Sequence, residues 1–288
     1  MTTHPAALPQ TPAEELRYAF GANWRSFVRS ALNEKRVAHA VDSLRGFLGV
    51  ETLRGRSFLD VGCGSGLFSL AACLLEADVV RSFDFDADSV AATRALQSRV
   101  AVSGGRWSVE QGSVLDPAFM SGIEPADVVY SWGVLHHTGR MWDAIDAAAG
   151  KVRPGGRFAI SIYNRVERFP DSSKMWWRVK RAYTRGPALV RRGLEAVYVG
   201  NFMLTRLLTL RNPFAALLDR EGEGRRGMDF MHDVRDWLGG FPYEYATSGE
   251  VFGHVHARHG FELERLVNWE GNACNELLFR RPLTPGEE

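Results

Sequence analysis

Short apolar segments alternate with helical segments through the middle of the chain, from residue 57 to residue 162. Residues 57–61 fit a buried strand, residues 67–75 an apolar, alanine-rich start of a helix, and residues 79–83 a second strand. Repeated strand and helix units predict an α/β domain whose sheet is mostly parallel, with helices on both faces. Ligands of such sheets bind beyond the carboxyl ends of the strands.

Two more strands are predicted near the end of the chain, after a long interruption. Residues 262–268 and 276–280 alternate or run apolar, as strands do. This pair would complete a seven-stranded sheet. We therefore divide the chain into an N-terminal tail and helical region at 1–50, a core at 51–164 and 232–282, and an insertion at 165–231.

The N-terminal region shows helical periodicity. Residues 13–49 fit two helices broken near Gly21, and the second carries an apolar stripe formed by Trp24, Phe27, Val28, Ala31 and Leu32. Such a stripe usually indicates packing on the core.

The insertion concentrates positive charge. The whole chain has a formal net charge of +1, but residues 174–211 contain nine Lys or Arg and one acid, Glu195, which is a local net charge of +8. The spacing predicts an amphipathic basic helix, with Lys174, Arg178, Arg181 and Arg185 on one side and Trp176, Val179 and Tyr183 on the other.

Three interpretations of the insertion stay open. Its apolar side could pack on the core as a cap over the substrate. Its basic and aromatic residues also suit a surface for an anionic membrane or a lipid-linked substrate. Nucleic acid is the least favoured partner, because no recognised binding motif accompanies the charge.

Composition adds few constraints. The 288 residues are 45% hydrophobic, which is ample for a core, and the three cysteines lack the spacing of zinc ligands or of a disulfide framework. The N-terminus lacks the blocks of a signal peptide, and no uninterrupted apolar run has the length of a membrane span. We expect a cytoplasmic protein, with peripheral membrane contact as an alternative.

The strongest chemical signal is the turn between the first predicted strand and helix. Asp60 is followed by Gly62, Gly64 and Gly66, a G-x-G-x-G spacing. Glycine lets backbone approach a ligand, and the N–H groups of a helix start attract negative charge. The dinucleotide fingerprint is G-x-G-x-x-G, and an acid before it would repel a pyrophosphate. Asp60 would instead suit a cofactor that carries an ammonium group.

Asp84 ends the second predicted strand, where its carboxylate can accept hydrogen bonds from both hydroxyls of a ribose. With segments 107–116, 126–137 and 152–162, the turn resembles the class I S-adenosylmethionine-dependent methyltransferases, most closely the UbiG-like, type 11 and 12 branch. The resemblance covers roughly residues 57–163. It implies a Rossmann-like, seven-stranded, mostly parallel sheet with an N-terminal helical lid, a helical insertion after the fifth strand, and S-adenosylmethionine as cofactor.

The resemblance also implies the cofactor-binding residues. The methionine portion would contact Asp60, Gly62, Cys63, Gly64 and Gly66, and the ribose would contact Asp84, beside Phe85. Adenine would lie between Ser113 and Val114, and the sulfonium near Ser131 and Trp132. Position 113 is Ser where the family commonly has Asp, which makes the acceptor for the adenine amino group weaker or different. Trp24 becomes a candidate for closing the lid over the substrate.

Methyl transfer mainly requires alignment of acceptor, methyl carbon and sulfur, but a hydroxyl acceptor also needs a base. His136 and His137 follow the fourth strand, and histidine has a suitable pKa. Since only one of two adjacent side chains points inward, we favour His136 as the base and a structural role for His137. Tyr163, at the end of the fifth strand, is the second catalytic candidate.

The segment after the insertion supplies the substrate candidates. Gly239, Gly240 and Pro242 predict that residues 232–245 form a loop, and loops on a rigid sheet commonly bind ligands. The candidates are Asp236, Trp237, Tyr243 and Glu244.

We predict no metal site. His254, His256 and His259 lie on a helix expected at 248–259, where the first two diverge and only His256 and His259 could share a side, without a nearby acid.

The favoured function is methylation of a small-molecule or lipid-linked acceptor, at oxygen. Methylation of nitrogen, carbon or sulfur, or of protein or RNA, is the alternative within catalysis. A non-catalytic module that binds the cofactor and contacts a partner through the insertion is the alternative of another class. A fold alone does not decide among them.

Overall fold

The computed structural model describes residues 34–100, 106–168, 170–210, 212 and 230–283. Its centre is one seven-stranded sheet in the order β3-β2-β1-β4-β5-β7-β6. All neighbouring pairs are parallel except those made by β7, which runs antiparallel to β5 and β6. The strands are β1 Ser57–Val61, β2 Val79–Asp84, β3 Trp107–Gln111, β4 Ala126–Trp132, β5 Val152–Tyr163, β6 Glu262–Val267 and β7 Cys274–Arg280.

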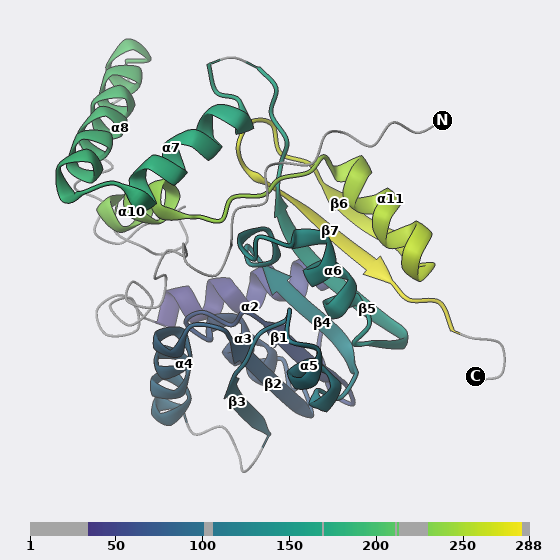
Figure 1. Ribbon diagram of the computed structural model, residues 1–288. Coiled ribbons are helices and arrows are strands. Elements are labelled where there is room, and N and C mark those ends of the chain that lie inside the picture. The colour runs from purple at the N-terminus through teal and green to yellow at the C-terminus, as the bar shows by residue number, and fades with distance from the viewer. Residues whose placement is uncertain (1–33, 101–105, 169, 211, 213–229, 284–288) are drawn as a thin grey trace.

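Helices cover both faces of the sheet (Figure 1). One face packs against α2, α3 and α4, and the other against α5, α6 and α11. The bounds of these helices are α2 Glu34–Leu48, α3 Leu67–Leu74, α4 Ala87–Arg99, α5 Pro117–Gly122, α6 Met141–Ala149 and α11 Ser248–His259. The predicted mostly parallel, Rossmann-like architecture is confirmed.

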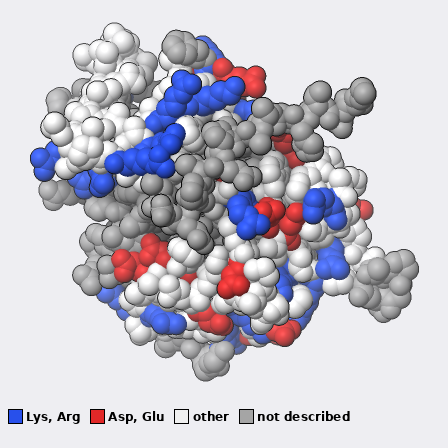
Figure 2. Space-filling view, viewed as in Figure 1, with Lys and Arg blue, Asp and Glu red and all other residues white. Residues whose placement is uncertain are grey.

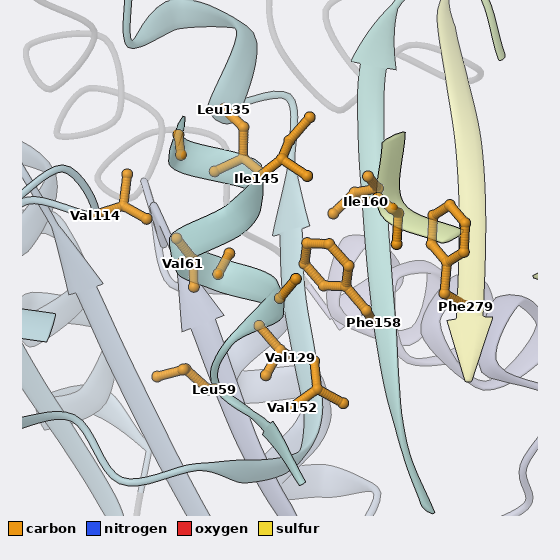
Figure 3. Close-up of a cluster of buried hydrophobic side chains, with 14 of the residues drawn as sticks. Leu59, Val61, Val114, Val129, Leu135, Ile145, Val152, Phe158, Ile160 and Phe279 are labelled. Carbon is orange, nitrogen blue, oxygen red and sulfur yellow. The ribbon is translucent and has the colours of Figure 1, made fainter. Parts of the chain in front are cut away.

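Alternation along the strands divides the core into two clusters. On β1, Phe58 belongs to the cluster under α2 and α3, whereas Leu59 and Val61 point to the opposite face. Figure 3 shows the second cluster, in which β4, β5 and β7 contribute Val129, Phe158, Ile160 and Phe279 against the helical Ile145. Successive side chains of a strand point to opposite faces, so strands buried on both sides read as continuous apolar runs.

The insertion forms a separate helical group beyond one end of the sheet (Figure 1). It contains α7 Ser173–Arg185 and α8 Ala188–Leu208, which pack with α10 Phe230–Gly239. No helix in the described part of the chain is both long enough and apolar enough to span a bilayer.

One element differs from the sequence-based expectation. Residues 232–239 lie in helix α10 and not in a loop. Phe230, Val234 and Leu238 repeat every four residues and are buried, which gives the helix a packed side. Gly239 and Gly240 lie at the end of this helix, where they do not interrupt it. Only the part that begins at Gly240 is irregular.

Candidate functional site

The glycine turn folds tightly over the carboxyl ends of β1 and β2. The N–H groups of Gly62 and Cys63 both donate to the Phe83 carbonyl, at 2.9 and 3.1 Å. Gly62, Gly64 and Gly66 have φ values of 81°, 54° and 77°, a region that favours glycine. A Cβ on Gly62 would lie 2.3 Å from the Val134 side chain, so this turn requires glycine and also touches the segment after β4.

Asp84 lies at the same edge, half-buried. Its two carboxylate oxygens accept the N–H groups of Gly64, at 3.0 Å, and Asp86, at 2.9 Å. Each oxygen has a second lone pair. Burial raises the pKa of Asp84 to about 6, although these two backbone hydrogen bonds act to lower it.

Asp60 is buried more deeply than expected for a residue that contacts the cofactor. It is 3% exposed, and its Oδ2 accepts the Ser69 hydroxyl at 2.5 Å. Ser69 in turn contacts the Ser82 hydroxyl, to which the Trp107 indole donates at 2.8 Å. Burial raises the pKa of Asp60 to about 7. The side chain thus joins β1 to α3, and its direct contact with a cofactor stays a prediction.

Three further predicted cofactor residues lie at the same edge. Ser113 and Val114 follow β3 after Gly112, and the Ser113 hydroxyl accepts the Leu115 N–H at 3.1 Å. Phe85 follows Asp84 with 54% of its surface exposed. The contacts of these three residues with a cofactor remain predictions.

Two residues at the end of β4 are engaged in packing. The buried Ser131 hydroxyl donates to the Val61 carbonyl at 2.9 Å. The Trp132 ring stacks on Tyr130 and meets Phe47 of α2 edge-on, with ring centres 5.3 and 4.9 Å apart. Helix α2 therefore packs on the core at this point, and the predicted contact of Trp132 with a sulfonium is untested.

The two histidines after β4 have different environments. His136 is fully buried, and its Nδ1 accepts the Tyr163 N–H at 3.2 Å. Since this nitrogen must be unprotonated to accept, a neutral His136 carries its proton on Nε2. His137 is half-buried, with Nδ1 2.6 Å from the Pro242 carbonyl oxygen. A carbonyl can only accept, so neutral His137 is protonated on Nδ1 and has its lone pair on Nε2.

Aromatic rings surround the histidines. Tyr163 lies 4.0 Å from the His136 ring and 5.4 Å from the His137 ring, measured between centres. Trp237 and Tyr243 extend this cluster, with ring centres 5.7 and 5.1 Å from that of Tyr163. The structure therefore brings together Tyr163, Trp237 and Tyr243, three of the predicted catalytic and substrate residues.

Lys180 enters this aromatic cluster from α7. Its ammonium lies 3.9 Å from the Trp237 ring centre and 4.9 Å from that of Tyr243, and it donates to the Trp237 carbonyl oxygen. The side chain is fully buried, and burial lowers its pKa to about 7. In the sequence Lys180 is only one of the nine basic residues between positions 174 and 211. Its position on the apolar side of α7, three residues before Tyr183, was the signal in the sequence that could have predicted its burial.

Comparison with known proteins identifies the core. Residues 59–158 match the family model described as a methyltransferase domain. The matched segment runs from the glycine turn through β5. Over these residues the core therefore resembles a class I methyltransferase domain.

Relatives of the methyltransferase domain include enzymes with different acceptors. A ribosomal protein L11 methyltransferase from Azotobacter vinelandii is 35% identical over 111 residues, 38% of this chain and 35% of that protein. A ubiquinone biosynthesis O-methyltransferase from Cupriavidus pinatubonensis is 31% identical over 137 residues, 46% of this chain and 52% of that protein. The chain thus spans about a third to a half of the length of these curated relatives.

Solved structures share the fold at low sequence identity. Magnesium protoporphyrin IX methyltransferase from Synechocystis, with bound SAH, gives a TM-score of 0.52 at 14% identity over 92% of this chain and 95% of its own. PKMT2 from Rickettsia typhi, in complex with AdoHcy, gives 0.55 at 13% identity over 87% of this chain and 53% of its own. Both support the fold of the methyltransferase domain.

The cofactor of this methyltransferase domain is S-adenosylmethionine, and the geometry agrees with it. The turn at Gly62 has no room for a side chain, so its backbone can approach the ligand. Asp84 is half-buried, and its two oxygens have four lone pairs, one more than the backbone N–H groups of Gly64, Phe85 and Asp86 that interact with them.

Two of the predicted substrate residues, Glu244 and Asp236, lie outside the aromatic cluster around the histidines. Both oxygens of Glu244 accept the Met141 N–H, at 3.1 Å each, so this carboxylate holds the start of α6. Asp236 lies on helix α10, in the turn that ends with Gly239, and not on a loop. Trp24 lies outside the described residues. Contact of these three side chains with a substrate remains a prediction.

The histidines of α11 pair differently from the expectation. His254 and His259, and not His256, both lie 2.8 Å from Asp146 Oδ1. The expected absence of a nearby acid was therefore wrong, because Asp146 comes from α6, far away in sequence. Within the described residues no group of three or more His, Cys, Asp or Glu side chains has a metal-binding arrangement.

Proposed function

We propose that this chain transfers a methyl group from S-adenosylmethionine to an oxygen atom of a small-molecule or lipid-linked acceptor. One observation carries the proposal. The glycine turn lies beside Asp84 at one edge of the sheet. Its Gly62 packs against the side chain of Val134, which is three residues before His137 in the sequence. The groups suited to holding the cofactor and the group suited to taking a proton therefore lie at one edge of the sheet.

His137 is our choice for the proton acceptor, in place of the expected His136. The Pro242 carbonyl orients the His137 ring and holds its proton on Nδ1, which makes Nε2 the basic nitrogen. His136 could act as a base at Nδ1 only after releasing the Tyr163 N–H. We assign His136 and Tyr163 to positioning, since they pack directly against His137.

The chemistry then needs little else from the protein. When held by the glycine turn and Asp84, S-adenosylmethionine would supply a methyl group on a positively charged sulfur, and the acceptor oxygen would form its bond to the methyl carbon as that sulfur leaves. His137 Nε2 takes the hydroxyl proton as that bond forms. The aromatic residues Tyr163, Trp237 and Tyr243 exclude water beside the histidines.

Methylation of a protein nitrogen is the second candidate function. It draws support from the similarity to the ribosomal protein L11 methyltransferase. The orientation of His137 favours oxygen, because a neutral imidazole is matched to the removal of a hydroxyl proton near neutral pH.

Methyl transfer from labelled S-adenosylmethionine to a panel of a phenol, an amine, a thiol and a ribosomal protein tests the proposal. We expect an O-methyl product, no transfer by Asp84→Ala, and no binding of S-adenosylhomocysteine by that variant. A methylated amine or protein as the product would show that the acceptor atom is nitrogen and not oxygen. If the cofactor binds but no acceptor is methylated, the binding-module alternative is favoured.

A further inference from the structure

Helix α8 has one side that faces solvent and carries no charged residue. Leu189, Val197 and Leu204 on this side are 82%, 70% and 53% exposed, and Leu207 and Leu208 are 61% and 74% exposed. Helical spacing places these five residues on one side together with Gly193, Ala196 and Gly200. We call the surface formed by Leu189, Val197, Leu204, Leu207 and Leu208 the outer face of α8.

The opposite side of α8 already supplies the packing that holds the helix. Leu194, Tyr198 and Phe202 join a cluster with α7 and α10, where Phe202 and Phe230 have ring centres 4.9 Å apart. Glu195, the one acid of this helix, accepts the Tyr183 hydroxyl at 2.6 Å. The outer face therefore adds exposed apolar surface that this packing does not use.

A row of positive charge lies beside the outer face. Lys174, Arg178 and Arg185 of α7 are exposed, and Arg181 is half-exposed. Figure 2 shows Lys and Arg gathered over the region of α7, next to the uncharged surface of α8. Helix α7 itself contains no acidic residue. We call Lys174, Arg178, Arg181 and Arg185 the basic row.

We infer that the outer face of α8 and the basic row together bind an anionic membrane surface. A helix that lies in the interface buries an apolar side among the acyl chains while neighbouring Lys and Arg contact anionic headgroups. The 21 residues of α8 correspond to a length of about 30 Å. Contact along this length suits a chain in which no described helix can span the bilayer.

Charge favours lipid over a second copy of the chain. A twofold dimer through the outer face would bring the same surface of both copies together. The basic row of each copy would then lie close to that of the other, which like-charge repulsion opposes. Anionic headgroups neutralise the basic row and accept the leucines at the same time.

Flotation with phosphatidylcholine vesicles, with and without about 30 mol% phosphatidylglycerol, tests the inference. We expect the full chain to bind the anionic vesicles at least about tenfold more strongly, and the difference to shrink at high salt. Leu207→Glu and Arg178→Glu should each weaken this binding about tenfold. Leu74→Glu and Arg56→Glu alter an exposed leucine and an exposed arginine elsewhere and serve as matched controls.

Three results would overturn the inference. The first is equal or absent binding to the two kinds of vesicle. The second is an equal loss in the control variants, which would make the effect unspecific. The third is a dimer, detected by light scattering, that Leu207→Glu dissociates without changing vesicle binding, because a second copy would then cover the outer face. Retained binding of S-adenosylhomocysteine in each variant shows that the core is folded.

Discussion

The ammonium nitrogen of Lys180 lies 3.9 Å from the centre of the Trp237 ring. The contact joins α7 to α10 next to the histidines. Lys180 is fully buried there. A cation over an aromatic face is attracted to it, but removal of the charge from water opposes burial. Burial lowers the pKa of Lys180 to about 7, which disfavours the charged form in the folded state.

Lys180→Met should therefore stabilise the protein at low pH. Below pH 7 both folded and unfolded chains hold the lysine proton, and the folded state bears the full cost of burial. Between pH 7 and the unfolded pKa of about 10.4 only the unfolded chain keeps the proton, so wild-type stability rises with pH. We expect the variant to gain about 1 to 3 kcal/mol in free energy of unfolding at pH 6 and less at pH 9.5.

Urea denaturation at the two pH values measures this difference. Lys174→Met removes an exposed lysine of the same helix and should change stability little. A Lys180→Met variant that is less stable at both pH values would show that the cation–π contacts outweigh the burial.

Cofactor affinity should depend on the ionisation of Asp84. Its pKa is raised to about 6, so the carboxylate becomes protonated as the pH falls through that value and loses acceptor capacity for the ribose. Titration calorimetry with S-adenosylhomocysteine should show a Kd about tenfold higher at pH 5 than at pH 7.5. Asp84→Asn should bind weakly at both. A wild-type Kd that does not change with pH would exclude Asp84 as the titrating contact.

Substitution of each histidine in turn should distinguish the roles of His136 and His137. His137→Gln should lower kcat about 10²- to 10⁴-fold with little change in cofactor Kd. His136→Gln should have a smaller effect on kcat, accompanied by lower thermal stability because His136 is buried against Tyr163. The reverse order of effects on kcat would return the role of base to His136.

Gly62→Ala should disturb both folding and binding. The added Cβ would lie 2.3 Å from Val134, at a φ of 81°. We expect a loss of about 1 to 3 kcal/mol in the free energy of unfolding and weaker binding of S-adenosylhomocysteine. Gly122→Ala is the matched control, because nothing lies within 4 Å of its added Cβ. Equal stability of the two variants would show that the turn can relax around a side chain.

The sheet and the cofactor edge were predictable because they depend on local sequence. Alternating apolar strands fix the order of units, and helix α11 was expected with its observed bounds. The start of β7 at Cys274, two residues earlier than expected, is a change at one end of an element only. Glycine spacing and an acid at a strand end have direct geometric consequences, so the expectation of a ribose contact at Asp84 needs only the local sequence.

The acceptor side depends on contacts between distant segments and was predicted less well. Which of two adjacent histidines holds its proton on Nδ1 is decided by Pro242, more than a hundred residues later in the chain. The burial of Lys180 depends on the rings of Trp237 and Tyr243. Gly239 suggested a loop because glycine is common in loops. That it instead ends a helix depends on the packing of Phe230 and Val234, which the local sequence does not show.

The chain leaves the sheet after β5 and first returns to it at the same point. Asn164 and Ala246 form a parallel bridge, and the Ala246 N–H donates to the Tyr163 carbonyl at 3.0 Å. The more than eighty residues between these positions thus begin and end beside the last residue of β5. A segment attached in this way can lengthen, shorten or be exchanged during evolution without altering the register of the sheet. The acceptor specificity of this fold can therefore diverge while the cofactor edge stays unchanged.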